Sequence, residues 1–263
     1  MKKIIFYGAG NISQALIEGL ISAGYDKKYI YFVDRNKSNT KKLTKIGVKK
    51  INHDSIQATD LVFLAVKPKD ALFAFDEIIK IHEKIKIISL VAGIKSNKFL
   101  ARSKTIELIR AMPNTSSRFN KGITAIYNKS SSKTTFKKVS DILKKVGILI
   151  EVEKEAYIDD FTGLIGSGPA YFFYLLKVYE KRITKLCNGD TEKSNEIITN
   201  LLEGIALSIS NNNNLDDLIS AVASKKGTTE AGLESFKTSK LSQSFEKGII
   251  RAIKRAKEIS KEY

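Results

Sequence analysis

The residues best suited to chemistry form a glycine turn near the start of the chain. Gly8-Ala9-Gly10-Asn11-Ile12-Ser13 follows an apolar run at residues 4–7 and precedes a helical pattern. A strand, a glycine-rich turn and a helix in this order form the fingerprint of dinucleotide binding. Gly8 permits the tight turn, Gly10 lets a pyrophosphate approach the backbone, and the helix N-terminus attracts the anion. Ser13 replaces the usual third glycine, and an ordinary glycine turn in an α/β protein is the alternative.

Two charged side chains mark a second place where cofactor chemistry is expected. Asp34 and Arg35 follow the second predicted strand, roughly twenty residues after the glycine turn. An acidic side chain there binds the adenine-ribose hydroxyls of NAD, whereas a nearby arginine accommodates the 2′-phosphate of NADP. The chain carries both. Arg35 together with Lys37 favours NADP, with NAD as the second choice and a solvated charged turn as the structural alternative.

Alternating strand and helix patterns fill the first part of the chain. Apolar, β-branched runs predict strands, and apolar residues three or four apart predict helices. The alternation indicates an α/β domain over residues 1–153 with a doubly wound, largely parallel sheet. Its predicted strands are 2–7, 29–33, 61–66, 86–91, 105–109, 123–127 and 147–152, and its predicted helices are 11–23, 38–46, 68–82 and 132–146.

The pattern changes after residue 153, where only helical periods follow. Residues 154–263 are therefore predicted to form an all-α domain. The segment from Tyr171 to Tyr179 is apolar nearly all round, which predicts burial on every side. This burial would come either from dimerisation or from a central position of the helix in a monomeric core. The predicted helices are 155–187, 190–211, 214–222, 228–237 and 241–261.

Composition excludes several classes of protein. The 263 residues are 43% hydrophobic, enough for a folded core. The single cysteine, Cys187, excludes a disulfide framework, and neither His53 nor His82 has a second ligand at metal spacing, so no metal site is expected. The apolar runs are too short to span a membrane, and the chain starts with a strand pattern in place of a signal peptide. A soluble cytoplasmic protein without a membrane partner is expected.

The formal charge of +17 raises nucleic-acid binding as a further possibility. The lysines are spread along the whole chain, and aromatic residues are not interleaved with them as a stacking surface requires. We therefore expect no nucleic-acid partner. A basic surface still favours anionic ligands through long-range steering.

Five motifs in a fixed order carry a resemblance to a known family. With them the chain resembles the pyrroline-5-carboxylate reductases, which catalyse the last step of proline biosynthesis, over nearly its whole length. The third and fourth motifs are far more specific to that family than the first, which many dehydrogenases share. The motifs are Gly8-Ala9-Gly10-Asn11-Ile12, Ala65-Val66-Lys67-Pro68, Arg110-Ala111-Met112-Pro113-Asn114-Thr115, Gly166-Ser167-Gly168-Pro169-Ala170-Tyr171 and Ser224-Lys225-Lys226-Gly227-Thr228-Thr229.

The resemblance implies reduction of Δ1-pyrroline-5-carboxylate to L-proline by hydride transfer from NADPH or NADH to the imine carbon. It implies an N-terminal Rossmann domain and a C-terminal helical domain that intertwines two protomers into a homodimer, often assembled further into a decamer. Met112, Pro113 and Asn114 would flank the nicotinamide. The other residues implied to touch the cofactor are Tyr7, Gly8, Ala9, Gly10, Asn11, Ile12, Arg35, Asn52, Ala65, Val66, Lys67, Pro68 and Ala92.

The resemblance assigns the substrate to the loop from Ser224 to Thr229, contributed by the partner subunit. Ser224 and the N–H groups of Gly227, Thr228 and Thr229 would bind the substrate carboxylate, and Thr229 would act as the catalytic residue by hydrogen bonding to the imine nitrogen. The family loop reads Ser-Pro-Gly-Gly-Thr-Thr, whereas this chain has Lys225-Lys226 in the middle. A left-handed backbone at Lys226 would cost about 1 kcal/mol or more, while two lysines would strengthen anion binding.

Two alternatives stay open beside this activity. One is a related reductase of another small imine or oxo acid, in which the altered loop marks a different substrate. The other is a catalytically impaired homologue that binds the cofactor without turnover.

Overall fold

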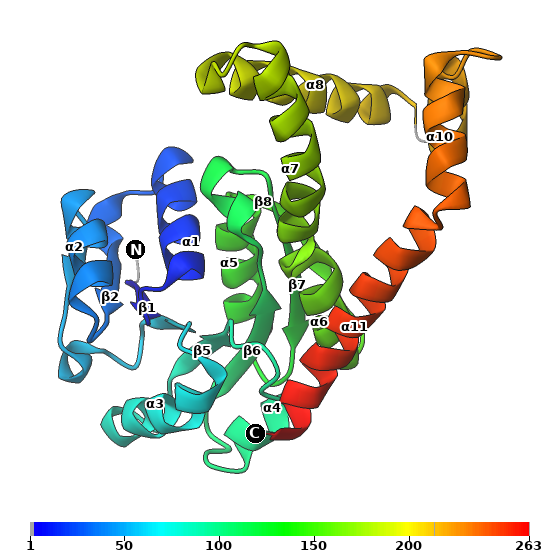
Figure 1. Ribbon diagram of the computed structural model, residues 1–263. Coiled ribbons are helices and arrows are strands. Elements are labelled where there is room, and N and C mark those ends of the chain that lie inside the picture. The colour runs from blue at the N-terminus through cyan, green and yellow to red at the C-terminus, as the bar shows by residue number, and fades with distance from the viewer. Residues whose placement is uncertain (1–2, 213, 263) are drawn as a thin grey trace. The chain divides into compact units, whose positions relative to one another are not determined.

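The computed structural model describes residues 3–212 and 214–262 and divides them into two compact units. The first unit comprises residues 3–167 and 251–262, and the second comprises residues 168–250. The last helix, α11 (Leu241–Glu262), therefore contributes to both units. Figure 1 shows the order of the elements along the chain. The predicted domain boundary after residue 153 stays a prediction.

An eight-stranded sheet forms the centre of the first unit, with strand order β3-β2-β1-β4-β5-β6-β7-β8. The strands from β3 to β6 are parallel, β7 runs antiparallel to β6, and β8 is parallel to β7. The prediction of a largely parallel, Rossmann-type sheet is confirmed. The strands are β1 (Ile4–Tyr7), β2 (Ile30–Val33), β3 (Lys49–Lys50), β4 (Leu61–Leu64), β5 (Lys86–Ser89), β6 (Glu107–Met112), β7 (Gly122–Asn128) and β8 (Gly147–Glu151).

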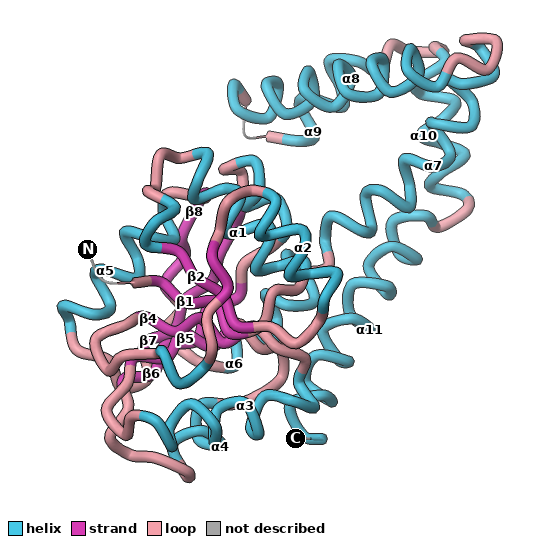
Figure 2. Tube along the Cα trace, turned by 90° about the vertical axis from the view of Figure 1, so that its left-hand side faces the viewer, coloured by secondary structure: helices cyan, strands magenta, loops and turns pink. Residues whose placement is uncertain are grey.

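Helices cover both faces of this sheet, as Figure 2 shows in side view. Alternate residues of a strand point to opposite faces. Phe6 and Phe63 accordingly pack with α1, α2 and α5, whereas Ile5 and Val62 pack with α3 and α4. The helices of this unit are α1 (Asn11–Ser22), α2 (Lys37–Lys45), α3 (Pro68–Ile81), α4 (Ser96–Leu100), α5 (Lys133–Lys144) and α6 (Ala156–Phe161), together with short 3-10 turns at Lys27–Tyr29, His53–Ser55 and Thr115–Phe119.

Strand β6 differs from the prediction, which ends it at Ile109. The strand continues through Met112 because the antiparallel neighbour β7 pairs with it, Arg110 opposite Tyr127 and Met112 opposite Ala125. The segment predicted as a closing turn therefore begins inside the sheet. Strand β3 was not predicted, since Lys49–Lys50 is too short and too polar to show a strand pattern.

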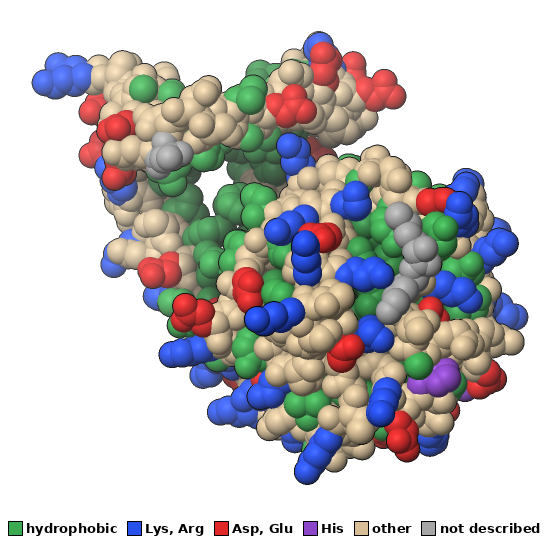
Figure 3. All heavy atoms as spheres, turned by 180° about the vertical axis from the view of Figure 1, so that it is seen from behind, with side chains coloured by type: hydrophobic (Ala, Val, Ile, Leu, Met, Phe, Trp, Pro, Cys, Tyr) green, Lys and Arg blue, Asp and Glu red, His purple; other side chains and the backbone are tan. Residues whose placement is uncertain are grey.

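The second unit is made of helices, and many of its apolar side chains are exposed. The predicted helix 155–187 is interrupted by a π-helical segment, Thr162–Gly166. Phe172, Phe173 and Tyr174 are 60%, 67% and 76% exposed, so the single chain does not bury this segment on every side. Figure 3 shows such hydrophobic side chains at the surface of the helices. The helices are α7 (Gly168–Leu186), α8 (Thr191–Asn211), α9 (Leu215–Val222), α10 (Thr228–Thr238) and the first part of α11.

Three features of the folded chain bear on its possible partners. Lysine and arginine side chains are scattered over the face of the molecule drawn in Figure 3, with no single stripe. Over residues 3–212 and 214–262, no helix has both the length and the apolar character that crossing a bilayer requires. The same residues contain no group of three or more metal-ligating side chains.

Candidate functional site

The glycine turn between β1 and α1 is shaped by contacts with the neighbouring strand. Gly8 has a φ of +101°, and a Cβ there would lie 2.5 Å from the carbonyl oxygen of Ala65. Both the left-handed backbone and the close approach therefore require glycine. The Ser13 hydroxyl, buried at the third fingerprint position, donates a hydrogen bond of 2.6 Å to the Gly8 carbonyl. Ser13 thus closes the turn in place of the usual glycine.

Gly10 differs from Gly8 because the protein itself does not require a glycine there. Its φ of −69° and ψ of −174° are open to any residue. A Cβ built on it would meet no atom within 4 Å. The missing side chain leaves free space directly before the first turn of α1, which is the space that a pyrophosphate needs.

The N-terminus of α1 faces this space without a side-chain cap. Gly10 makes no capping hydrogen bond, and the first turn contains no acidic residue. The first helical hydrogen bond runs from Gln14 N to Gly10 O, so the amides of Asn11, Ile12 and Ser13 precede the intrahelical ladder. These N–H groups and the helix dipole form an arrangement that binds phosphate anions.

Asp34, the residue predicted to bind the adenine ribose, also stabilises the glycine turn by hydrogen bonding. Its Oδ2 accepts hydrogen bonds from Ala9 N at 2.6 Å and Asn39 Nδ2 at 3.3 Å. Its Oδ1 accepts from Asn36 N at 2.5 Å. Both carboxylate oxygens are thus engaged within the protein. Arg35 is exposed and forms no ion pair with the residues that the structure describes, so its guanidinium is available to an anion.

The other residues predicted for the cofactor follow neighbouring strands at the carboxyl edge of the sheet. Ala65 N donates to Tyr7 O, which joins the ends of β4 and β1. Asn52 follows β3 and is exposed, and Ala92 follows β5 and is half-buried. Val66 and Lys67 lead into α3, which starts at Pro68 with no side-chain cap. In doubly wound sheets, ligands bind at this edge.

Tyr7, the last residue of β1, is half-buried at this edge. Burial raises the pKa of the Tyr7 hydroxyl, and the charge of Glu77 raises it further, against a lowering by Arg35. The hydroxyl is therefore neutral at physiological pH.

Met112, Pro113 and Asn114, the residues predicted to flank the nicotinamide, are buried among protein atoms. Met112 is 8% exposed and packs with Ala125, Val152 and Ile158. Asn114 is 6% exposed, and its side-chain oxygen accepts from Ile123 N at 3.1 Å. Both therefore hold the β6–β7 connection. Their contact with a cofactor stays a prediction.

A buried charge cluster behind these segments was not predicted. Arg110 is 1% exposed, and its Nη1 donates to Glu155 Oε1 at 3.0 Å. The same oxygen accepts from Ser96 N at 2.6 Å and Ser96 Oγ at 2.8 Å. Arg110 Nη2 also reaches the Val91 carbonyl at 3.5 Å, one residue before Ala92. The cluster thus fixes the ends of β5 and β6. Its one sequence signal is an arginine within an apolar strand.

The predicted substrate loop lies in the second unit and has a tight conformation. Lys226 has a φ of +61°, and its N–H donates to Glu230 Oε2 at 2.6 Å. A Cβ on Gly227 would lie 2.3 Å from Ser224 Oγ, so the loop brings Ser224 against the start of α10. Gly227 caps α10 without a side-chain hydrogen bond, which leaves the amides of Thr228 and Thr229 in the uncapped first turn.

Comparison with known proteins identifies relatives of both parts of the chain. A family model described as pyrroline-5-carboxylate reductase dimerisation matches residues 155–259, and one described as NADP oxidoreductase, coenzyme F420-dependent, matches residues 3–93. Pyrroline-5-carboxylate reductase 1 of Bacillus subtilis is 34% identical, covering 99% of this chain and 90% of that protein.

Two solved structures are similar over the same length. A pyrroline-5-carboxylate reductase from Coxiella burnetii is 28% identical with a TM-score of 0.82, covering 98% of each chain. The pyrroline carboxylate reductase of Plasmodium falciparum, solved with NADP bound, is 23% identical with a TM-score of 0.87, again covering 98% of each chain.

Proposed function

The chain belongs to the pyrroline-5-carboxylate reductase family, and we propose that it is a cytoplasmic enzyme that reduces Δ1-pyrroline-5-carboxylate to L-proline. The observation that carries the proposal is Gly10, whose missing side chain leaves open space before an uncapped helix start. The residues present fit a nicotinamide dinucleotide there. When bound, the reduced nicotinamide supplies the hydride that the imine carbon takes up.

The protein's own part in this reaction is to bind and orient two anions. The amides of Asn11, Ile12 and Ser13 hold the cofactor pyrophosphate. In the substrate loop, Ser224 and the amides of Thr228 and Thr229 hold the substrate carboxylate, and the Thr229 hydroxyl bonds the imine nitrogen. The Gly227 amide, predicted to join them, donates instead to the Ser224 carbonyl at 2.9 Å. An imine is basic enough to arrive protonated, so orientation supplies most of the catalysis and no strong side-chain acid is required.

NADPH is the preferred cofactor in this proposal, with NADH as the second. Both oxygens of Asp34 are engaged by backbone and side-chain N–H groups, which weakens its hold on a ribose hydroxyl. Arg35 is exposed beside it and suits a 2′-phosphate. The variant Arg35→Ala should raise the KM for NADPH by about tenfold and leave the KM for NADH nearly unchanged. An equal rise for both cofactors would contradict this preference.

The functional assembly is proposed to be a homodimer through the helical unit. Phe172, Phe173 and Tyr174 are exposed in a single chain, and apolar surface of this extent marks an interaction site. The family model that matches this region describes dimerisation. Analytical ultracentrifugation should show a dimer or a larger multiple of it, and Phe173→Glu should shift the population toward monomer. A wild-type monomer at micromolar concentration would contradict the proposal.

The activity is tested by oxidation of NADPH and NADH in the presence and absence of the pyrroline. We expect oxidation only when the pyrroline is present. Gly10→Val should raise the cofactor KM at least tenfold while the chain stays folded, because the added side chain enters space that no protein atom fills. Absence of turnover with either cofactor in folded, dimeric protein would contradict the activity, and turnover of a different imine alone would favour the related-reductase alternative.

A further inference from the structure

A pocket of about 300 Å³ opens beside the charge cluster of the first unit. This volume is at the small end of the range found for small-molecule sites. None of its lining residues is among those predicted for the cofactor or the substrate. They come from the loop before α4, from the region of α6 and from the last turns of α11, and they are Lys95, Glu155, Ala156, Asp159, Lys257, Ser260 and Lys261.

Two of the lining residues, Asp159 and Ser260, are buried polar side chains. Asp159 and Ser260 are 4% and 6% exposed. Within the described part of the chain, neither Asp159 Oδ1 nor Ser260 Oγ has a hydrogen-bond partner. The nearest cationic atom to Asp159 Oδ1 is Arg110 Nη2 at 3.9 Å, too far for a hydrogen bond. Buried polar groups are nearly always hydrogen-bonded. Asp159 Oδ1 and Ser260 Oγ therefore each need a hydrogen-bond donor, and a ligand in the pocket that both residues line could supply it.

Glu155 differs from Asp159 although both line the pocket. Its Oε1 already accepts from Ser96 N, Ser96 Oγ and Arg110 Nη1. Burial raises the pKa of the Glu155 carboxyl, but these donors and the Arg110 charge outweigh it, and the pKa is lowered. For Asp159, burial dominates over the opposing charges of Arg110 and Lys95 and raises the pKa. Of the two carboxylates that line the pocket, that of Glu155 is already hydrogen-bonded within the protein, whereas Asp159 Oδ1 is left for a ligand.

The rim of the pocket has the opposite character. Lys95, Lys257 and Lys261 are exposed. Lys257 Nζ is paired with Asp160 Oδ1 at 2.6 Å. Lys95 and Lys261 form no ion pair with any residue in 3–212 or 214–262. Two free ammonium groups thus border a pocket whose floor accepts hydrogen bonds.

A ligand that binds both the buried acceptor atoms and the lysine rim must carry positively charged N–H donors at one end and anionic oxygens at the other. A simple anion would meet the Asp159 carboxylate, and a simple cation would meet the lysines. We propose that this pocket binds a free α-amino acid as its zwitterion. The ammonium group donates to Asp159 Oδ1 and Ser260 Oγ, and the carboxylate lies between Lys95 and Lys261.

Calorimetric titration of the full chain tests this site. The probes are L-alanine, L-glutamate and L-lysine, which share the zwitterion and differ in side chain. Glycine betaine has the same two charges but no N–H donor, and inorganic phosphate is a simple anion. We expect saturable binding of at least one amino acid, and at least tenfold weaker binding of betaine and phosphate. No amino-acid binding, or equal binding of betaine, would overturn the proposal and leave the pocket to solvent.

Variants locate the binding. Asp159→Asn keeps the shape of the side chain, and Lys261→Met keeps most of its length, and each should weaken amino-acid binding at least tenfold. Lys98→Met removes an exposed lysine of α4 outside the pocket and is the matched control. Thr229→Ala should also leave binding unchanged, which separates this site from the proposed reductase site. Unchanged binding in Asp159→Asn, or an equal loss in Lys98→Met, would contradict the assignment. Since binding needs no turnover, its failure leaves the reductase proposal standing.

Discussion

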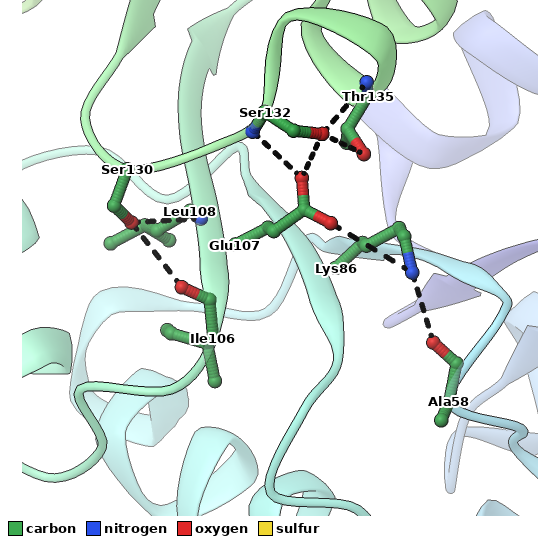
Figure 4. Close-up of polar contacts among 8 residues, drawn as sticks. All are labelled: Ala58, Lys86, Ile106, Glu107, Leu108, Ser130, Ser132 and Thr135. Carbon is green, nitrogen blue, oxygen red and sulfur yellow. Dashed lines mark hydrogen bonds and ion pairs between the residues drawn. The ribbon is translucent and has the colours of Figure 1, made fainter.

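Strand β6 carries two charged clusters that differ in how completely their polar atoms are paired. At its first residue, Glu107 Oε2 accepts from Ser132 N and Ser132 Oγ, both at 2.8 Å. Lys86 Nζ lies 3.9 Å from Glu107 Oε1 and donates to the Ala58 carbonyl at 3.2 Å (Figure 4). In the second half of the strand, the cluster of Arg110 leaves Arg110 Nε and Asp159 Oδ1 without a hydrogen-bond partner among residues 3–212 and 214–262.

The Glu107 cluster is therefore structural, whereas the Arg110 cluster leaves polar atoms that a ligand could pair with. Burial raises the pKa of Glu107, but hydrogen bonds from Thr135 and Ser132 and the Lys86 charge outweigh it, and the pKa is lowered. Glu107 therefore stabilises the fold in its charged form and supports the start of α5 through Ser132. At Asp159 the effect of burial outweighs the charges of Arg110 and Lys95, and the pKa of the carboxyl is raised. Burying the charged Asp159 carboxylate without full pairing lowers the stability of the fold, whereas burying Glu107 does not.

The largest effect is expected from Arg110→Met. The change leaves the half-buried Glu155 and the buried Asp159 without their cation, and breaking a buried pair in this way costs about 3–5 kcal/mol. Urea denaturation should show the loss as a lower midpoint. The double variant Arg110→Met with Glu155→Gln should recover part of it, because one uncompensated charge is gone. A loss below about 1 kcal/mol, typical of exposed pairs, would mean that the cluster is not held as described.

A smaller loss is expected from Glu107→Ala. Ser132 N and Ser132 Oγ lose their acceptor at the start of α5, which should cost about 1–2 kcal/mol. Because the pKa of Glu107 is lower in the folded than in the unfolded chain, this contribution is present at neutral pH. It is lost as the pH falls through the folded-state pKa. Thermal denaturation of wild type and variant from pH 7 to pH 3 should therefore converge. A constant difference across this range would contradict the electrostatic explanation.

Asp159→Asn should change stability in the opposite direction, by on the order of 1 kcal/mol. The raised pKa means that the folded chain binds the Asp159 proton more tightly than the unfolded chain. The charged side chain therefore costs stability as the pH rises through the folded-state pKa. The variant should be more stable than wild type at pH 7 and equal to it below about pH 4. Destabilisation at pH 7 would indicate that the carboxylate is well paired.

The smallest effect is expected from Lys86→Met. At 3.9 Å its ion pair with Glu107 is long, and the change otherwise removes one hydrogen bond, to the Ala58 carbonyl. We expect a loss below about 1 kcal/mol in urea denaturation. A loss as large as that of Glu107→Ala would show that the polar contacts of Lys86, and not the Ser132 hydrogen bonds, stabilise this end of β6.

Local patterns were enough to predict much of the fold and part of the candidate site. Gly8 and Gly10 stand in a strand-turn-helix context that depends on neighbouring residues alone, and the parallel sheet follows from the alternation of elements. The Arg110 cluster could not be predicted in the same way. Glu155 lies 45 residues from Arg110 in the sequence, and the packing of α6 against β6 brings them together. The engagement of Asp34 by Ala9 was missed for the same reason, since it joins two separate turns.

The placement of residues 251–262 in the first unit sets an order of events during synthesis. A Cβ on Gly93 would lie 2.4 Å from Ile259 Cγ2, and one on Gly163 would lie 2.6 Å from Ile253 N, so α11 packs closely on both glycines. Domains generally fold as units while the chain emerges from the ribosome. Here the sheet can form early, but its covering over Gly93 must wait until Ile259 has been made. The nascent chain therefore holds an uncovered surface throughout synthesis of the second unit.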